Sequence, residues 1–207
     1  MSNEQCLVLG TSNQKKGGEL AALFAPLGLV VRTLTDFPEA IEVNETGATF
    51  AENAALKASL QAKHLGRWVL GEDSGLAVDA LDGAPGVFSA RYSGPGATDA
   101  SNNAHLLTEL GSIPLENRQA HYVCHMTLCD PTGQIAAESE DVCRGRIVFE
   151  PRGANGFGYD PLFEIVECHR TFGQLSPAVK ACLSHRARAA RKLVAEVACL
   201  LESGRWR

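Results

Sequence analysis

Two adjacent acids lie between apolar runs near the middle of the chain. Residues 68–70 and 76–78 predict two short buried strands, with Glu72 and Asp73 between them. Neighbouring residues on a strand point to opposite faces, so the two acids share a face only if the chain bends, which Gly75 would permit. Acids at the end of an apolar strand need a partner, water or a cation. Mg²⁺ is such a cation, although a polar strand-to-turn boundary would also explain these residues.

A polar turn and two lysines follow the first predicted strand, residues 5–9. A helix begins after this turn, and Lys15 and Lys16 lie in its first turn, where the helix dipole disfavours cations. A phosphate bound at the helix N-terminus would explain them; a solvated lysine pair is the alternative. Three consecutive residues suit the N-cap: Thr11, Ser12 and Asn13.

A second helix is predicted from Thr49 to Leu65. Thr49 with Glu52 three residues later has the capping-box spacing. Lys57 lies on this helix, and Glu45 lies in the polar loop before it. For Lys57 alone, an ordinary surface charge is the simpler interpretation.

The C-terminal third adds a glycine-rich loop, residues 153–159, and a cationic helix start. Phe157 stands between two glycines, so it could stack on a flat ligand that the backbone approaches closely. His185 and Arg186 begin the last predicted helix, and Lys180 precedes them. For His185 alone, a structural histidine is equally reasonable.

The length suits one large domain, residues 1–207, or two small lobes, and the predicted strands and helices along the chain favour a mixed α/β fold. The chain is 45% hydrophobic and 21% charged, and its net charge of −5 argues against a broad nucleic-acid surface. No apolar run is long enough to cross a membrane, and no signal-like segment begins the chain. The seven scattered cysteines predict reduced thiols and a cytoplasmic location; a zinc site at Cys124, Cys129 and nearby histidines is disfavoured because no second ligand pair matches.

Together these segments resemble the inosine/xanthosine triphosphate pyrophosphatase family over nearly the whole chain. The matching motifs contain, in order, Thr11-Ser12-Asn13 with Lys16 and Glu19; Glu45-Thr46-Gly47 with Thr49-Phe50, Glu52-Asn53-Ala54 and Lys57-Ala58; Glu72-Asp73-Ser74-Gly75-Leu76; Gly83 to Tyr92; Gly156 to Phe163; and Ser184-His185-Arg186. Such motifs in the family's order are specific together. Gly173-Gln174 and Ala181 depart from the family's usual residues. These departures concern contacts around the site and do not change the predicted reaction.

The resemblance implies an elongated, two-lobed α/β body around a long mixed sheet, with an active site in the cleft between the lobes, and a homodimer. It implies Mg²⁺-dependent cleavage of the α–β phosphoanhydride of ITP, dITP and XTP. Asp73 would be metal ligand and general base, with Glu45 and Glu72 as further metal ligands. The residues implied to bind the triphosphate are Thr11, Ser12, Asn13, Lys16, Lys57 and Ser74; those implied around the base are Phe157, Gly158, Tyr159, Asp160, Lys180, His185 and Arg186.

Two other functions remain open at this point. One is a related pyrophosphatase that acts on pyrimidine or modified nucleotides, against which the Phe157 loop and residues 184–186 argue. The other is a non-catalytic nucleotide-binding protein. A pure binder has no need of metal carboxylates, so Glu45 and Asp73 argue against it.

Overall fold

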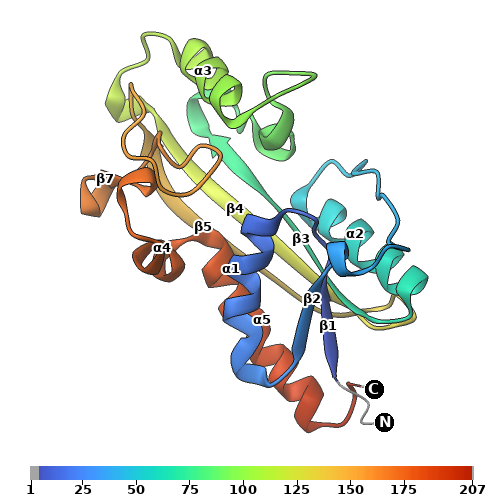
Figure 1. Ribbon diagram of the computed structural model, residues 1–207. Coiled ribbons are helices and arrows are strands. Elements are labelled where there is room, and N and C mark those ends of the chain that lie inside the picture. The colour runs from blue at the N-terminus through green and yellow to red at the C-terminus, as the bar shows by residue number, and fades with distance from the viewer. Residues whose placement is uncertain (1–4, 207) are drawn as a thin grey trace. The chain divides into compact units, whose positions relative to one another are not determined.

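The computed structural model describes residues 5–206 as an α/β protein (Figure 1). The strands form a 7-stranded mixed sheet in the order β2-β1-β3-β4-β5-β6-β7. The strands are β1 Cys6–Leu9, β2 Val30–Thr33, β3 Trp68–Val78, β4 Gln119–Cys129, β5 Ile135–Ile147, β6 Phe163–Ile165 and β7 Arg170–Thr171. The α-helices are α1 Gln14–Phe24, α2 Phe50–Leu65, α3 Asp99–Leu110, α4 Pro177–Leu183 and α5 His185–Glu202.

The α/β class predicted from the sequence is confirmed. By its internal contacts the chain divides into two compact units. Unit 1 comprises residues 1–73, 124–141 and 186–207; unit 2 comprises residues 74–123 and 142–185.

Unit 1 has helices on both faces of its strands, and strand alternation decides which side chain meets which helix. Leu7 and Leu70 belong to the apolar cluster with α1 and α5, whereas Val8 and Val69 belong to the cluster with α2. Alternate side chains of a strand point to opposite faces of the sheet. Both sets are buried here, as in other sheets with helices on both faces. In Figure 1, α1 and α5 lie side by side while α2 lies across the strands from them.

The contact between β3 and α2 needs small residues on both sides. Ala54, Ala58 and Ala62 are fully buried and form a small-residue stripe on this helix. A Cβ at Gly71 would meet the Ala54 carbonyl oxygen and would lie 2.7 Å from the Ala58 nitrogen. Glycine is therefore required here by the close approach of the two backbones.

The central stretch corrects one prediction. Residues 68–70 and 76–78 are not two strands separated by a turn but parts of the single strand β3. Gly75 does not bend the chain, and Glu72 and Asp73 remain in extended backbone. Buried apolar residues continue on both sides of the acids, with Leu70 and Leu76 nearly inaccessible, and this burial favours uninterrupted pairing.

Unit 2 surrounds its own apolar core. Leu76 and Val78 of β3 pack there with Leu106 and Leu110 of α3 and with aromatic residues of the later strands. Tyr122 contacts Phe163 and Phe172, with ring centroids 4.7 and 6.1 Å apart. Tyr159 of the glycine-rich loop belongs to this core, and Leu183 of α4 packs against it.

The predicted capping box of the second helix is confirmed. Thr49 caps α2 with Glu52. Asp99 to Leu110 forms α3, and Asp130 to Gly133 joins β4 and β5. The short strands β6 and β7 were missed, because runs of two or three residues carry too little periodicity.

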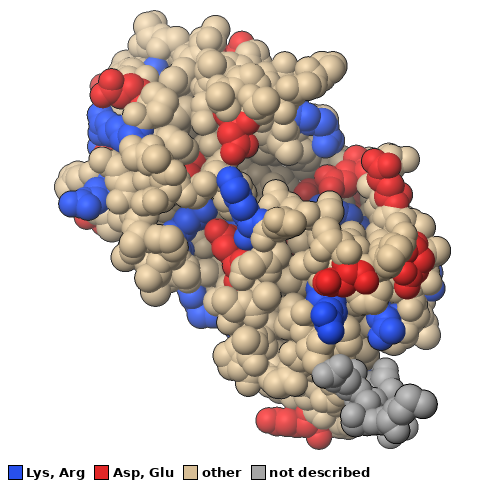
Figure 2. Space-filling view, viewed as in Figure 1, with Lys and Arg blue, Asp and Glu red and all other residues tan. Residues whose placement is uncertain are grey.

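On the face drawn in Figure 2, acidic and basic side chains are interspersed rather than gathered into one extended patch. No helix within residues 5–206 is both long and apolar enough for a membrane span.

Candidate functional site

The start of α1 is organised by Asn13. Its Oδ1 accepts hydrogen bonds from the backbone N–H groups of Lys15 (3.0 Å) and Lys16 (3.2 Å). Its own N–H donates to Thr11 Oγ1 at 3.1 Å, while Ser12 is exposed. The predicted cap is therefore present, and it already occupies N–H groups expected to face an anion.

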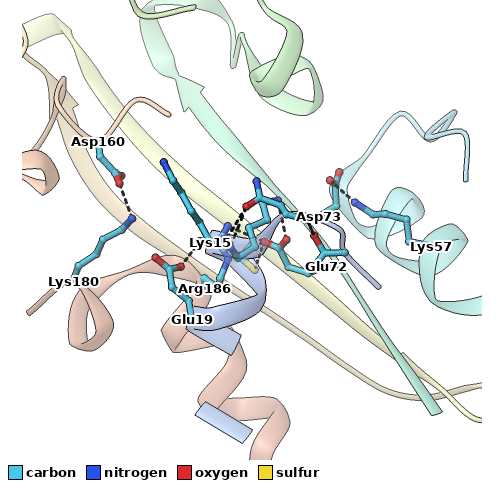
Figure 3. A network of polar contacts seen from close by, with 12 residues as sticks. Lys15, Glu19, Lys57, Glu72, Asp73, Asp160, Lys180 and Arg186 are labelled. Carbon is cyan, nitrogen blue, oxygen red and sulfur yellow. Dashed lines mark hydrogen bonds and ion pairs between the residues drawn. The ribbon is translucent and has the colours of Figure 1, made fainter. Parts of the chain in front are cut away.

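The Glu72 carboxylate forms ion pairs with cations from two helices. Lys16 Nζ of α1 donates to its Oε2 at 2.9 Å. Arg186 of α5 donates to its Oε1 through Nε at 3.2 Å and Nη2 at 3.1 Å. The Cys124 thiol donates to the same Oε1 at 3.5 Å. Only 1% of the Glu72 side chain is exposed, so this carboxylate is enclosed by its partners (Figure 3).

Arg186 is held from a second side by Glu19. Its Nη1 donates to Glu19 Oε2 at 2.8 Å. Burial by itself lowers the pKa of Arg186, but the Glu72 and Glu19 carboxylates outweigh it and raise that pKa. The guanidinium therefore stays charged although only 3% of its side chain is exposed.

Asp73 pairs with α2 instead. Lys57 Nζ donates to Asp73 Oδ1 at 2.9 Å and to Glu45 Oε1 at 3.0 Å. Asn53 Nδ2 donates to Asp73 Oδ2 at 3.3 Å. Burial raises the pKa of the Asp73 carboxyl, although Lys57 opposes this. Burial lowers the pKa of Lys57, but its acidic neighbours reverse the effect and raise it.

The Asp73 and Glu45 carboxylates both contact the Lys57 ammonium. Such a pair of neighbouring carboxylates is suited to binding a hard cation. Among residues 5–206, no three His, Cys, Asp or Glu side chains are grouped as an all-protein metal site. Two carboxylates are, however, the protein donor set that Mg²⁺ commonly uses, since water and phosphate oxygens complete its coordination. The residues present therefore fit Mg²⁺.

Asp160 links the glycine-rich loop to α4 within unit 2. Its Oδ2 accepts from the Phe157 backbone N–H at 2.8 Å and from Lys180 Nζ at 2.6 Å. Lys180 Nζ also lies 4.5 Å from the centroid of the Phe157 ring, a cation–π distance. A Cβ at Gly156, where φ is +79°, would meet this Asp160 oxygen. The loop thus brings together three predicted base-binding residues.

Helix α3 fixes the same loop from its other side. The Gly158 N–H donates to Asp99 Oδ2 at 2.8 Å, and Asn103 Nδ2 donates to the Gly158 carbonyl at 3.0 Å. Between α3 and the loop lies a pocket of about 470 Å³ that Phe157 helps to line. Tyr159 points elsewhere, since its hydroxyl donates to the Ser89 carbonyl at 2.8 Å and the residue is buried.

The remaining predicted residues divide between the two units. His185 belongs to unit 2, where its ring stacks on Tyr122 with centroids 4.6 Å apart. Ser74 is the first residue of unit 2 and is partly exposed on β3. Arg186 is in unit 1 with Glu72, whereas Lys180 and Asp160 are in unit 2.

Several residues that hydrogen-bond to the site side chains were not predicted as site residues. Asn53 contacts Asp73, and its position one turn before Lys57 was the available signal. Cys124 contacts Glu72 across 52 residues of sequence, for which no local pattern exists. The other residues missed in this way are Glu19, Asp99 and Asn103.

The departures at residues 173 and 174 lie beside the glycine-rich loop. The Gly173 N–H donates to the Asp160 carbonyl at 2.9 Å, and a Cβ at Gly173 would lie 2.6 Å from the Arg152 carbonyl oxygen. The Gln174 side chain accepts from the Thr171 N–H at 3.1 Å. Glycine at 173 therefore suits the packing of this chain.

The fold and the site first define a class of protein. It is an α/β protein with a mixed, helix-covered sheet, in which buried carboxylates at one strand are paired with lysine and arginine. The family follows from sequence comparison, because the model of the Ham1 family matches residues 7–196. The chain belongs to the Ham1 family.

Relatives and solved structures agree with this assignment. The chain is 51% identical over 197 residues to a dITP/XTP pyrophosphatase of Rhodopirellula baltica, covering 95% of each chain. It is similar to the structure of a HAM1 protein from Coxiella burnetii, with a TM-score of 0.85, 38% identity and coverage of 93% of this chain and 98% of that one. A Mycobacterium abscessus structure described as a nucleoside-triphosphatase / dITP/XTP pyrophosphatase matches with a TM-score of 0.74 and 43% identity, covering 91% and 97%.

Proposed function

We propose that this protein hydrolyses ITP, dITP and XTP to the nucleoside monophosphate and pyrophosphate. The observation that carries the proposal is the convergence of Asp73 and Glu45 on Lys57 Nζ, at 2.9 and 3.0 Å. A pair of carboxylates beside cations suits a metal-assisted attack on a phosphoanhydride. The names of the relatives supply the substrate class.

Asp73 and Glu45 would hold Mg²⁺, and Asp73 would accept the proton of the attacking water. Burial raises the pKa of Asp73, which makes its carboxylate a stronger base. The water oxygen bonds to the α-phosphorus, the bond from this phosphorus to the bridging oxygen breaks, and pyrophosphate leaves. Bound Mg²⁺ would supply positive charge for the phosphate oxygens in the transition state.

The triphosphate would lie against the polar turn before α1 and the cations near it. Lys16, with 20% of its side chain exposed, would donate to phosphate oxygens, and Lys57 would balance the carboxylates. Hydroxyl and amide groups would add neutral donors. These come from Thr11, Ser12, Asn13 and Ser74.

The base would be recognised by groups of unit 2 around the glycine-rich loop. Phe157 would stack on the purine while Lys180 donates to the 6-keto oxygen and Asp160 accepts from the neighbouring N1–H. Adenine has a 6-amino donor and an unprotonated N1 acceptor at these positions. Lys180 and Asp160 would each lose a hydrogen bond to it, which costs about 1–3 kcal/mol of binding free energy per group. His185, Gly158 and Tyr159 would shape the surroundings, and the buried Arg186 of α5 would contribute its positive charge.

We also propose a homodimer in the cytoplasm. The dimer rests on the family resemblance, and the location rests on free thiols, such as the buried Cys124 and Cys129. Light scattering after size-exclusion chromatography would show about twice the chain mass of 22.1 kDa if the dimer is correct.

The reaction is tested by identifying both products. Wild-type protein is incubated with ITP and Mg²⁺, and nucleotides are separated by ion exchange while pyrophosphate and orthophosphate are assayed separately. IMP and pyrophosphate in equal amounts are expected. IDP with orthophosphate would refute cleavage of the α–β bond.

A further inference from the structure

We propose that Glu72 is a positioning residue for Lys16 and Arg186 and not a ligand of the metal. This inference rests on the proposed function, because it assigns a part within the same site. It departs from the expectation from family resemblance, which placed Glu72 with Asp73 and Glu45 around Mg²⁺.

The first support is that both Glu72 oxygens accept from cations. Asp73 differs, because one of its oxygens accepts from Lys57 and the other from the neutral Asn53 amide. Oε2 accepts from Lys16 at 2.9 Å. Oε1 accepts from Arg186 at 3.2 and 3.1 Å and from the Cys124 thiol at 3.5 Å. To ligate a metal, this carboxylate would have to give up charge-assisted bonds in a buried site.

The second support is the direction of the side chain. Glu72 lies with α1 and α5, whereas Asp73 contacts Asn53 and Lys57 of α2. Glu45, the other proposed metal ligand, contacts Lys57 as well. Strand alternation thus gives neighbouring carboxylates different partners, and Asp73 shares the Lys57 ammonium with Glu45.

The third support is the difference in exposure. The Glu72 side chain is 1% exposed, against 8% for Asp73 and 31% for Glu45. Arg186 is 3% exposed and Lys16 is 20% exposed. The anchored end of the Glu72 network is therefore buried, and Lys16 is the member that remains accessible to a phosphate.

It follows that Glu72 sets the positions of cations from α1 and α5. Glu19 assists by holding Arg186 Nη1 at 2.8 Å. Loss of Glu72 would leave these cations misplaced for the triphosphate while the metal carboxylates keep their partners on α2. A purely structural role would lower stability without changing how folded protein binds the nucleotide.

The test compares two variants with the same chemical change. Glu72→Gln removes the proposed positioning carboxylate, and Glu45→Gln, the control, removes a proposed metal ligand. Binding of Mn²⁺ is measured by electron paramagnetic resonance with the α,β-methylene analogue of ITP at saturation, and KM for ITP is measured separately. For Glu72→Gln we expect Mn²⁺ affinity within about twofold of wild type and KM raised about tenfold or more. For Glu45→Gln we expect Mn²⁺ affinity to fall about tenfold or more.

Each contrary result has its own meaning. Loss of Mn²⁺ affinity in Glu72→Gln equal to that in Glu45→Gln would overturn the inference. So would an unchanged KM in a folded Glu72→Gln protein. Wild-type protein that binds Mn²⁺ and the analogue but releases no pyrophosphate would refute the proposed function alone, since the Mn²⁺ comparison still decides the role of Glu72.

A second variant covers the case in which Glu72→Gln does not fold. Glu72→Gln/Arg186→Gln removes both members of the buried pair, so no uncompensated guanidinium remains. Circular dichroism would establish its fold. Mn²⁺ affinity within about twofold of wild type is expected, and a loss of about tenfold or more would overturn the inference.

Discussion

Glu72 and Asp73 are consecutive residues of β3, yet their carboxylates pair with different helices. Glu72 accepts from Lys16 of α1 and Arg186 of α5, and Asp73 accepts from Lys57 of α2. Because the strand is continuous through both residues, alternation directs the two acids to opposite faces. One short stretch thereby contacts helices on both faces of unit 1.

Asp73→Asn should remove turnover and keep the fold. The amide cannot act as the base and is a poorer ligand, so kcat should fall about 10³-fold or more. Steady-state kinetics and circular dichroism would be compared with those of wild type. A folded variant with more than about a tenth of wild-type kcat would contradict the role of Asp73.

Lys16→Ala should chiefly weaken nucleotide binding. The lost ammonium would otherwise contact phosphate oxygens, so KM for ITP should rise about tenfold. Lys192→Ala is a suitable control, because that lysine side chain is 59% exposed and pairs with Asp141. Equal KM values in Lys16→Ala and the control would exclude Lys16 from the site.

Lys180→Met should reduce discrimination between ITP and ATP. Loss of the donor for the 6-keto oxygen should lower kcat/KM for ITP about tenfold and leave the poor value for ATP nearly unchanged. The ratio of the two kcat/KM values is the measurement. A ratio equal to that of wild type would mean that Lys180 does not distinguish the bases.

The predictions from sequence succeeded where the pattern was local. Thr49 and Glu52 are three residues apart, and their spacing was enough to predict the cap of α2. By contrast, Arg186 and Glu72 are 114 residues apart, and the stack of Trp206 on Trp68 joins the C-terminal segment to β3. Such contacts depend on the tertiary fold, so no periodicity in the sequence indicates them.

The Trp68–Trp206 stack should stabilise unit 1. The rings lie 4.3 Å apart at 9°, and Trp206 is 5% exposed. Trp206→Ala should lower the free energy of unfolding by about 3 kcal/mol or more. Urea denaturation followed by circular dichroism would measure this, and a loss below about 1 kcal/mol would show that the stack contributes little.

Two glycine substitutions should change stability in opposite directions. Gly71→Ala should destabilise the protein by about 2 kcal/mol or more, because the added methyl meets the backbone of α2. At Gly18, on α1, an added Cβ meets nothing within 4 Å beyond the adjacent residues and backbone of its own helix, so Gly18→Ala should stabilise by about 0.5–1 kcal/mol. Thermal melts would contradict this account if both variants shifted in the same direction.

The most direct measurement is pyrophosphate release from ITP, XTP, dTTP, GTP and ATP, each with and without Mg²⁺. We predict fast, Mg²⁺-dependent release from ITP and XTP and slow release from ATP, because the 6-amino group and unprotonated N1 of adenine do not suit Lys180 and Asp160. Release from none of them, or equal release from ATP and ITP, would contradict the proposal that this chain selects and hydrolyses non-standard purine nucleotides.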